Sequence, residues 1–430
     1  MQIIELIEAT GAKVLAEVDK DLDVKISTDT RTIQKGDFYI PLKGASFDGE
    51  KFINQAFEKG AIGAFCTGDN GTLQVKDTLT AYLQLANYRR KKLNFTVVAI
   101  TGSSGKTTTK ELAASVLSEK FRTFKTPLNH NNEIGFCQTI FEAPDDTEIL
   151  VLEMGMRGLG EIELLSKYAE PDITIISNVG TAHIGRLGSR ENIAKAKCEI
   201  VKYQRGNIFI AHDDELIKKT VQFSGKKIFY SIKDVKILEK DTHYSKFEYY
   251  GNIYELNVGG DYNIENALSA INTGLALRMK VNEIQSGLKK YAPIEKRWEA
   301  VNAGGFEIIN DSYNANPESM RAFIDTIFEL YEKPVVILGD MGELGEDEIK
   351  YHSELGKYIN SHKNLRQDAE ILSIGKLSKY ITDGVTNCPA KHFETIEQAV
   401  DYIKNKDTKV QLFLKASRSM KFERIIEELK

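Results

Sequence analysis

From residue 94 onward, the sequence alternates short apolar runs with segments of helical period, and this alternation constrains the fold most. The runs are continuously apolar, as strands buried on both faces of a parallel sheet are. In order, they are FTVVAI, EILVLEMG, DITIISNVG, NIFIAH, FEIIND, PVVILGD, ILSIG and VQLFLKAS. We expect helices over 106–119, 190–203, 263–279, 317–331, 348–360, 395–404 and 419–429. The pattern predicts doubly wound α/β structure.

Three domains are predicted, as about 150 residues per domain suggests for 430 residues. Residues 1–93 form a small mixed α/β domain with a helix over 51–59. Residues 94–293 form a central doubly wound domain, in which 247–260 alternates like an antiparallel excursion. Residues 294–430 form a C-terminal Rossmann-like α/β domain.

Composition excludes several classes of protein. A formal net charge of −5 argues against a general nucleic-acid binder, which is usually basic. The amino-terminal stretch lacks the basic and apolar regions of a signal peptide, and no apolar run approaches the ~18 residues of a membrane span. We therefore expect a cytoplasmic enzyme or binding protein. Neither a zinc site nor a disulfide framework is indicated by the scattered cysteines, Cys66, Cys137, Cys198 and Cys388.

The stretch VVAITGSSGKTTTKEL (97–112) predicts a phosphate-binding turn between a strand and a helix. Lys106 supplies a mobile positive charge for outer phosphates, and the Thr107 hydroxyl is placed to ligate magnesium. Gly102 and Gly105 permit positive φ and close approach of a ligand. Ile100 stands where the full P-loop pattern has another glycine, so the match is to a shortened variant. The central domain is therefore predicted to be of the P-loop ATPase type. A strand–helix turn without a ligand is the alternative.

Three more residues lie near the ligand-binding edge of the predicted sheet. Glu153 ends one apolar run and His183 follows the next, so both lie at carboxyl ends of strands. A carboxylate suits magnesium, whereas imidazole prefers softer metals. For Glu153 and His183, capping or structural roles are the alternative. Spacing alone predicts that Lys197 is a solvated lysine on the surface of a helix.

Motifs along nearly the whole chain resemble the Mur ligases of bacterial cell-wall synthesis, in the order that this family shows. They are STDTR (27–31), LKGASFDGEKF (42–52), TGSSGKTTTKE (101–111), LNHNNEIG (128–135), EMGMRGLGEI (153–162), NVGTAHIGRLGSRENIAKAK (178–197), GDYNIENALSAI (260–271), EKRWE (295–299), NDSYNANPESM (310–320), LGDMGELG (338–345) and LKASRSM (414–420). DSYNANPESM and NNEIG resemble the branch that adds D-alanyl-D-alanine. The chain departs from the family at Ala416 and Cys198, which replace usual glycines, and at His130.

The resemblance implies an ATP-dependent ligase that joins UDP-N-acetylmuramoyl-tripeptide to D-alanyl-D-alanine through an acyl phosphate. Two magnesium ions are implied, one held by Thr107 and Glu153 and a second by His183. Lys197 would be carbamylated by carbon dioxide, because a bare ammonium repels magnesium whereas a carbamate binds it. Carbamylation needs the neutral amine, which at a pKa of about 10.4 is about one lysine in 10³ at pH 7.

The resemblance also assigns contacts from two domains to ATP. The loop contacts are Thr101, Gly102, Ser103, Ser104, Gly105, Lys106, Thr107 and Thr108. The remaining contacts are Asn263 and Asn266 for adenine, Arg297 for phosphates, and Asp311, Tyr313 and Asn314 for ribose and phosphate. The catalytic group is Lys106, Glu153, His183, Lys197 and Arg297. For Asn263, helix capping is the alternative to contact with adenine. Since the ATP contacts come from two domains, we expect these domains to close over the ligands.

Two weaker sets complete the predicted site. The UDP-linked substrate is assigned to Ser27, Asp29, Arg31, Lys43 and Asp48, for which surface ion pairs and turns are the alternative. The dipeptide side is assigned to Asp340, His352, Lys415 and Ser417, with a solvated loop as the alternative for the last two. We expect Phe38, Phe47 and Phe52 to lie in the core rather than to stack on a base.

Three other functions stay open at this point. One is a related Mur-type or folylpolyglutamate-type ligase with another amine acceptor, although folylpolyglutamate synthetases lack an amino-terminal domain of this kind. The others are a nucleotide-binding homologue that does not ligate, and a plain ATPase that hydrolyses ATP without either substrate. A monomer is expected.

Overall fold

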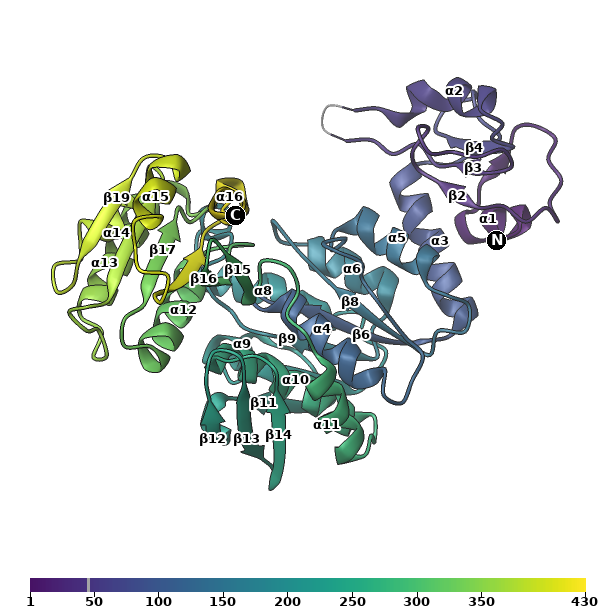
Figure 1. Ribbon diagram of the computed structural model, residues 1–430. Coiled ribbons are helices and arrows are strands. Elements are labelled where there is room, and N and C mark those ends of the chain that lie inside the picture. The colour runs from purple at the N-terminus through teal and green to yellow at the C-terminus, as the bar shows by residue number, and fades with distance from the viewer. Residues whose placement is uncertain (45–46) are drawn as a thin grey trace.

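The structure, a computed structural model, describes residues 1–44 and 47–430. Figure 1 shows three domains, each built around its own main sheet, with the chain passing through the central domain on its way to the C-terminal one. The three-domain α/β architecture predicted from the sequence is confirmed. The boundaries near residues 93 and 294 stay predictions. Among the helices of the described residues, none combines the length and the apolarity needed to cross a membrane.

The N-terminal domain holds a five-stranded sheet of order β1-β5-β4-β3-β2, in which β1 is antiparallel to β5 and the other pairs are parallel. Its strands are short: β1 (Lys13–Val14), β2 (Ile26–Ser27), β3 (Phe38–Tyr39), β4 (Gly63–Cys66) and β5 (Leu73–Gln74). Its helices are α1 (Ile3–Thr10), η1 (Gly49–Phe52), α2 (Ile53–Glu58) and the long α3 (Thr78–Leu93).

The central domain is a six-stranded parallel sheet of order β11-β10-β9-β6-β8-β7. The strands are β6 (Thr96–Thr101), β7 (Thr123–Lys125), β8 (Ile149–Glu153), β9 (Ile173–Ile176), β10 (Ile208–His212) and β11 (Lys226–Tyr230). The helices are α4 (Lys106–Leu117), α5 (Glu133–Glu142), α6 (Glu161–Ala169), α7 (Ile184–Leu187), α8 (Arg190–Cys198), η2 (Glu199–Val201), α9 (Glu215–Thr220), η3 (Ile232–Asp234), α10 (Asp261–Ala276) and α11 (Val281–Lys290). The chain leaves β6 toward β7 and β8 and then crosses to β9, so the strand order reverses at β6.

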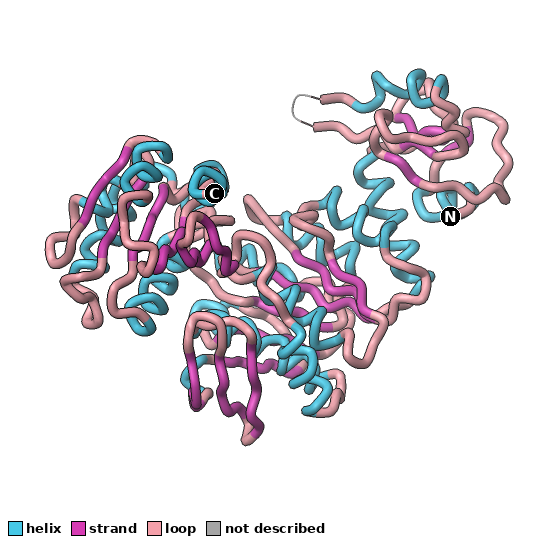
Figure 2. The backbone as a smooth tube through the Cα atoms, in the orientation of Figure 1, coloured by secondary structure: helices cyan, strands magenta, loops and turns pink. Residues whose placement is uncertain are grey.

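A separate antiparallel sheet interrupts the central domain. It consists of β12 (Lys236–Lys240), β13 (Ser245–Tyr249) and β14 (Asn252–Leu256), and it stands out at the lower edge of Figure 2. The last two strands confirm the antiparallel excursion expected over 247–260.

The C-terminal domain is a six-stranded sheet of order β15-β16-β20-β17-β18-β19, parallel except for β15. Its strands are β15 (Glu299–Ala303), β16 (Phe306–Asn310), β17 (Val335–Gly339), β18 (Glu370–Ile374), β19 (Ala390–Phe393) and β20 (Gln411–Lys415). Its helices are α12 (Pro317–Leu330), η4 (Gly345–Asp347), α13 (Glu348–Asn360), α14 (Lys379–Thr382), α15 (Ile396–Ile403), η5 (Arg418–Met420) and α16 (Glu423–Leu429).

Strand β6 shows why the apolar runs are continuous. Val98 and Ile100 are fully buried in one core, which α4 and α10 complete. Val97 and Ala99 point the other way and are fully buried in a second core with residues of α3, α5 and α6. Because both faces of the sheet are covered by helices, every position along the strand is apolar.

Helix α3 docks the N-terminal domain on the central one through Arg90, whose side chain is fully buried. Its Nε donates to the Ala169 carbonyl (2.8 Å) and its Nη2 to the Glu170 carbonyl (3.0 Å), at the carboxyl end of α6. Nη2 also lies 3.4 Å from the Asp172 carboxylate. Burial lowers the pKa of this guanidinium, and the charge of Arg205 lowers it further.

Arg90→Met is expected to lower the free energy of unfolding by about 2–4 kcal/mol, because it leaves the Ala169 and Glu170 carbonyls without their hydrogen-bond donor. Urea unfolding followed by circular dichroism measures the change. Lys91→Met is the matched control, since the side chain of Lys91, the next residue along α3, is 55% exposed. Equal shifts in the two variants would contradict this role of Arg90.

Candidate active site

The phosphate-binding turn lies at the reversal point of the central sheet, between the carboxyl ends of β8 and β9. Gly105 begins α4 in the left-handed region (φ +75°), and a Cβ there would lie 2.4 Å from Asn266 Oδ1. A Cβ on Gly102 would lie 1.8 Å from Ser177 Oγ. Both positions therefore require glycine. The Lys106 ammonium folds back and donates to the Gly102 carbonyl (2.8 Å).

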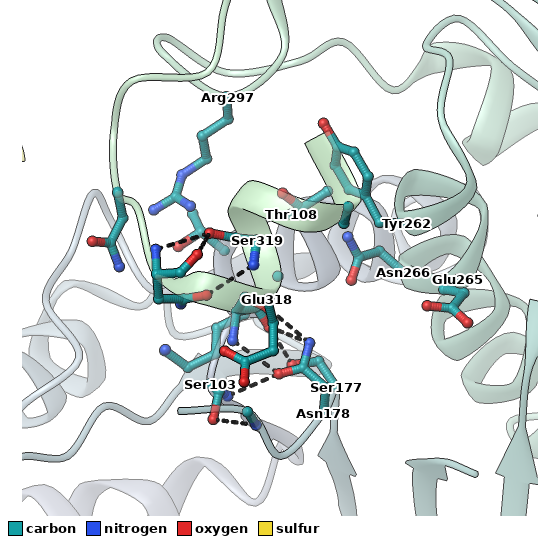
Figure 3. Close-up of a pocket in the computed structure, with 18 of the residues that line it drawn as sticks. Ser103, Thr108, Ser177, Asn178, Tyr262, Glu265, Asn266, Arg297, Glu318 and Ser319 are labelled. Atoms are coloured by element: carbon teal, nitrogen blue, oxygen red, sulfur yellow. Dashed lines mark hydrogen bonds between the residues drawn. The ribbon is translucent and has the colours of Figure 1, made fainter. Parts of the chain in front are cut away.

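Asn178, which follows β9, fixes the shape of this turn, and Figure 3 shows it beside Ser103 and Ser177. Its Oδ1 accepts hydrogen bonds from the backbone N–H groups of Ser103 (3.1 Å) and Ser104 (3.0 Å). Its Nδ2 donates to Ser104 Oγ (2.9 Å). Sequence reasoning missed this residue, although its place at the end of DITIISN, at a carboxyl strand end, was a usable signal.

A cavity of about 410 Å³ opens in front of the turn and is shared by the central and C-terminal domains. Most of the predicted ATP contacts line it: Ser103, Ser104, Gly105, Lys106, Thr107, Thr108, Asn263, Asn266, Arg297, Asp311, Tyr313 and Asn314. Glu153 and Lys415 also line it. The lining residues that sequence reasoning missed are Asn131, Ser177, Asn178, Val179, Gly180, His212, Asp214, Tyr262, Glu265, Trp298, Asn316, Glu318, Ser319 and Ala322. Thr101 and Gly102 are buried behind the turn.

The two asparagines of α10 present opposite hydrogen-bonding groups to the cavity. Asn263 Nδ2 donates to the Gly259 carbonyl (2.7 Å), which leaves its Oδ1 as an acceptor. Asn266 Oδ1 accepts from Thr109 Oγ1 (3.2 Å), which leaves its Nδ2 as a donor. An acceptor next to a donor complements an edge of adenine, where N6–H₂ donates and a ring nitrogen accepts.

The opposite wall comes from the C-terminal domain. The Arg297 guanidinium stacks on Tyr313, 3.9 Å from the ring centroid, and its buried Nε has no hydrogen-bond partner among the described residues. Lys415 Nζ lies 2.5 Å from Asp311 Oδ2 and donates to the Asn314 carbonyl (3.2 Å). Lys415 thus belongs to the wall of this cavity, and its assignment to the dipeptide stays a prediction.

Glu153 has the features of a magnesium ligand. Its side chain is buried, its Oε1 accepts from Asn131 Nδ2 (2.9 Å), and its Oε2 has no hydrogen-bond partner among the described residues. Lys110 Nζ is 3.9 Å from that oxygen. In the described part of the chain, no three His, Cys, Asp or Glu side chains gather as a metal site. Magnesium bound to a nucleotide needs few protein ligands, so Glu153 and the buried Thr107 fit such an ion.

Lys197 lies on α8 and is 1% exposed. Burial lowers the pKa of its ammonium well below the usual value, and the positive charge of Lys106 lowers it further. The solvated helix lysine that spacing alone suggested is therefore excluded. A neutral amine is the form that carbamylation requires.

His183 does not line the cavity, and it faces the C-terminal domain. It has left-handed backbone geometry (φ +66°), and its Nδ1 lies 2.6 Å from Glu343 Oε2. This proximity lowers the pKa of the Glu343 carboxyl. The assignment of His183 to a metal stays a prediction.

The residues assigned to the dipeptide are largely engaged within the C-terminal domain. Asp340 accepts from the backbone N–H groups of three residues, Lys376, Leu377 and Ser378. His352 is fully buried, accepts at Nε2 from Met341 N (2.9 Å) and donates from Nδ1 to the Glu348 carbonyl (2.7 Å). Ser417 Oγ donates to the Asp340 carbonyl (2.6 Å). The prediction for His352 is corrected, because a fully enclosed imidazole does not reach a substrate.

The residues assigned to the UDP-linked substrate lie in the N-terminal domain, apart from the cavity (Figure 1). Arg31 pairs with Asp29 (2.7 Å), and Lys43 Nζ lies 3.6 Å from Glu50. Asp48 caps η1 by accepting from Glu50 N (3.1 Å), and Ser27 ends β2. The assignments stay predictions, and the ion pairs and turns held open as the alternative are also present.

One aromatic residue of this domain departs from expectation. Phe38 is fully buried, as predicted. Phe47 is 54% exposed instead of lying in the core, and it stacks on the Phe52 ring with centroids 5.4 Å apart. The prediction for Phe47 was wrong because spacing alone does not distinguish an aromatic residue of a loop from one of the core.

The two buried departures from the family motifs are accommodated locally. Ala416 is fully buried, and a Cβ built on Gly339 would lie 2.6 Å from its methyl group, so the glycine at 339 makes room for it. Cys198 is buried, and burial raises the pKa of its thiol to about 12. It therefore acts as a small apolar residue beside Lys197.

Comparison with known proteins decides the family. The chain matches the Mur ligase middle domain over residues 100–274 and the Mur ligase, glutamate ligase domain over residues 296–418. It is 37% identical to UDP-N-acetylmuramoyl-tripeptide–D-alanyl-D-alanine ligase of Bacillus subtilis (strain 168), over 94% of this chain and 92% of that protein. The chain belongs to the Mur ligase family.

Solved structures match this Mur ligase along nearly all of its length. Crystal structure I of MurF from Acinetobacter baumannii is 28% identical, covers 100% of the chain and 98% of its own, and has a TM-score of 0.90. Crystal structure II of the same protein has equal coverage and a TM-score of 0.82. MurF ligase from Thermotoga maritima in complex with ADP is 27% identical over 96% of this chain and 98% of its own, with a TM-score of 0.84.

Proposed function

We propose that this Mur ligase uses ATP to join UDP-N-acetylmuramoyl-tripeptide to D-alanyl-D-alanine, in the cytoplasmic steps of peptidoglycan synthesis. The observation that carries the proposal is the shared cavity, where the phosphate turn of the central domain faces Arg297 and Lys415 of the C-terminal domain. The Bacillus subtilis relative, which carries this activity as its name, supports the choice of substrates.

The chemistry explains why one cavity serves both ATP and a carboxylate. A carboxylate is a poor electrophile, because attack on it must expel oxide. An oxygen of the tripeptide carboxylate therefore attacks the γ-phosphorus, and ADP leaves. The dipeptide amine then attacks the carbonyl carbon of the acyl phosphate, loses a proton, and expels phosphate as the amide forms. Phosphoryl transfer of this kind depends on positioning and on stabilising charge.

The residues of the cavity fit these needs. The turn N–H groups and Lys106 would hold the phosphates, and Asn263 with Asn266 would read adenine. Arg297, stacked on Tyr313 with a free Nε, would bind phosphate oxygens from the other side. Because the cavity is shared by the central and C-terminal domains, closure of these domains over the ligands would exclude water from the acyl phosphate.

Magnesium and a carbamate complete the proposed site. Thr107 and Glu153 are the residues placed to hold a magnesium ion, which when bound would offset phosphate charge. Lys197, whose burial lowers the pKa of its ammonium, would take up carbon dioxide, and His183 would hold a second ion. The N-terminal domain would hold the UDP group through Ser27, Asp29, Arg31, Lys43 and Asp48.

Phosphate release tests the proposal. With ATP, magnesium and UDP-N-acetylmuramoyl-tripeptide, release is expected to depend on added D-alanyl-D-alanine and to yield a product with the mass of the UDP-linked pentapeptide. Release without the dipeptide would favour a plain ATPase. No release with the dipeptide, but release with another amine, would favour a ligase of different acceptor specificity.

A further inference from the structure

A carboxylate of the C-terminal domain crosses into the central domain and binds a loop beside the phosphate turn. Glu318, in the first turn of α12, places its Oε2 3.0 Å from Thr181 N and 2.7 Å from Thr181 Oγ1, and both groups donate to it. Figure 3 shows this side chain directed toward Ser103 and Asn178. The Glu318 carboxyl group packs closely against Gly180, since a Cβ on Gly180 would lie 3.0 Å from it.

The N–H and O–H groups of Thr181 form a preorganised site for a negatively charged oxygen, here called the cradle. Thr181 is 8% exposed, so its N–H and O–H groups are held away from bulk water. Its loop is fixed on the phosphate turn, because Gly180 N donates to Ser103 Oγ (2.9 Å). Hydrogen bonds from buried neutral donors to an ionised oxygen are among the strong ones, and here two of them converge on a single atom.

The position of the cradle suggests what it holds during the reaction. Asn178, Val179 and Gly180, directly before it, line the ATP cavity, and His183 lies two residues after it. A first-turn acid on α12 would gain from the helix dipole without leaving its own domain. Glu318 instead crosses to the central domain, beside the cavity in which the γ-phosphate of ATP and the carboxylate of the UDP-linked peptide are proposed to meet.

We propose that the N–H and O–H groups of Thr181 are an oxyanion subsite of the active site, which the Glu318 carboxylate fills in the ligand-free protein. The ligand is a carboxylate or phosphoryl oxygen, supplied by the UDP-linked peptide or by the γ-phosphate of ATP. That anion displaces Glu318, because two negative oxygens do not share one pair of donors. The inference rests on the proposed function and adds a binding group to it.

Displacement predicts that Glu318 competes with one ligand. Isothermal titration calorimetry with two separate probes identifies it: UDP-N-acetylmuramoyl-tripeptide alone, and the β,γ-imido analogue of ATP with magnesium. Glu318→Ala is expected to lower the Kd of the displacing ligand about tenfold and to leave the other Kd unchanged. Thr181→Val, added to Glu318→Ala, is expected to reverse that gain, because the Oγ donor is lost while the shape is kept.

Controls separate this subsite from a simple contact between domains. Glu329→Ala removes a carboxylate from the far end of the same helix, where it pairs with Lys240, and should change neither Kd. Glu318→Gln keeps a hydrogen-bonding group and removes the charge, so it should tighten binding by a smaller factor even if the alanine variant folds poorly. Unchanged or weaker binding of both probes by Glu318→Ala would overturn the subsite. Failure of the wild type to bind the UDP-linked peptide would instead count against the proposed function.

Discussion

Lys106→Ala is expected to lower kcat for phosphate release by about 10³-fold, the loss that follows removal of one group aimed at charge developing in a transition state. Burial lowers the pKa of the Lys106 ammonium in the free protein, while Glu153 raises it and Arg297 lowers it further. We expect the phosphates of ATP to supply negative charge in the cavity and the ammonium to exchange its bond to the Gly102 carbonyl for bonds to them.

Steady-state phosphate release with saturating substrates measures the loss. Lys120→Ala is the matched control, because that exposed lysine follows the carboxyl end of the same helix and donates to the Arg278 carbonyl. The control should retain full activity, and both variants should unfold at the urea concentration of the wild type. A kcat within twofold of the wild type for Lys106→Ala would show that the turn does not hold the transferred phosphate.

The second large effect is expected at Lys197. Lys197→Ala should lose most of the activity and should regain part of it when acetate or formate is added, because a small carboxylate can occupy the place of a carbamate. The Lys197 side chain is buried, so its removal leaves an enclosed space that a small carboxylate can enter. The expected loss is about 10²–10³-fold, as for removal of one preorganised electrostatic group.

Lys195→Ala separates this effect from damage to the helix, since Lys195 is exposed on α8 two residues away. That control should keep wild-type activity and should not respond to acetate. Carbon-13 NMR with labelled bicarbonate should show a carbamate signal in the wild type and none in Lys197→Ala. Full activity of Lys197→Ala without additives would exclude a carbamate at this position.

The fold class could be predicted from the sequence because its signals are local. Continuous apolar runs predicted β6, β8 and β10 within one or two residues and β9 with an end four residues too late, since strands covered on both faces have no polar side. The glycine turn predicted the phosphate site, because two of its positions admit no side chain. Motif order along the chain predicted the family, and the comparisons confirmed it.

Other features depend on contacts between residues far apart in the chain, which periodicity does not encode. Asn178 braces the turn only because β9 lies beside β6 in the sheet. His352 was predicted from the sequence as a site residue, yet it is enclosed by packing. Its two ring nitrogens form hydrogen bonds with backbone groups of its own domain.

The sequence by itself therefore determined the elements, the phosphate turn and the family of this protein. Tertiary structure alone decided which side chains share the cavity, that Lys197 is buried beside the charge of Lys106, and that Glu318 reaches Thr181 across a separation of 137 residues. The physical reason is that turns and strands follow from steric and solvation preferences of neighbouring residues. Burial and the pairing of charges are set instead by the meeting of whole domains.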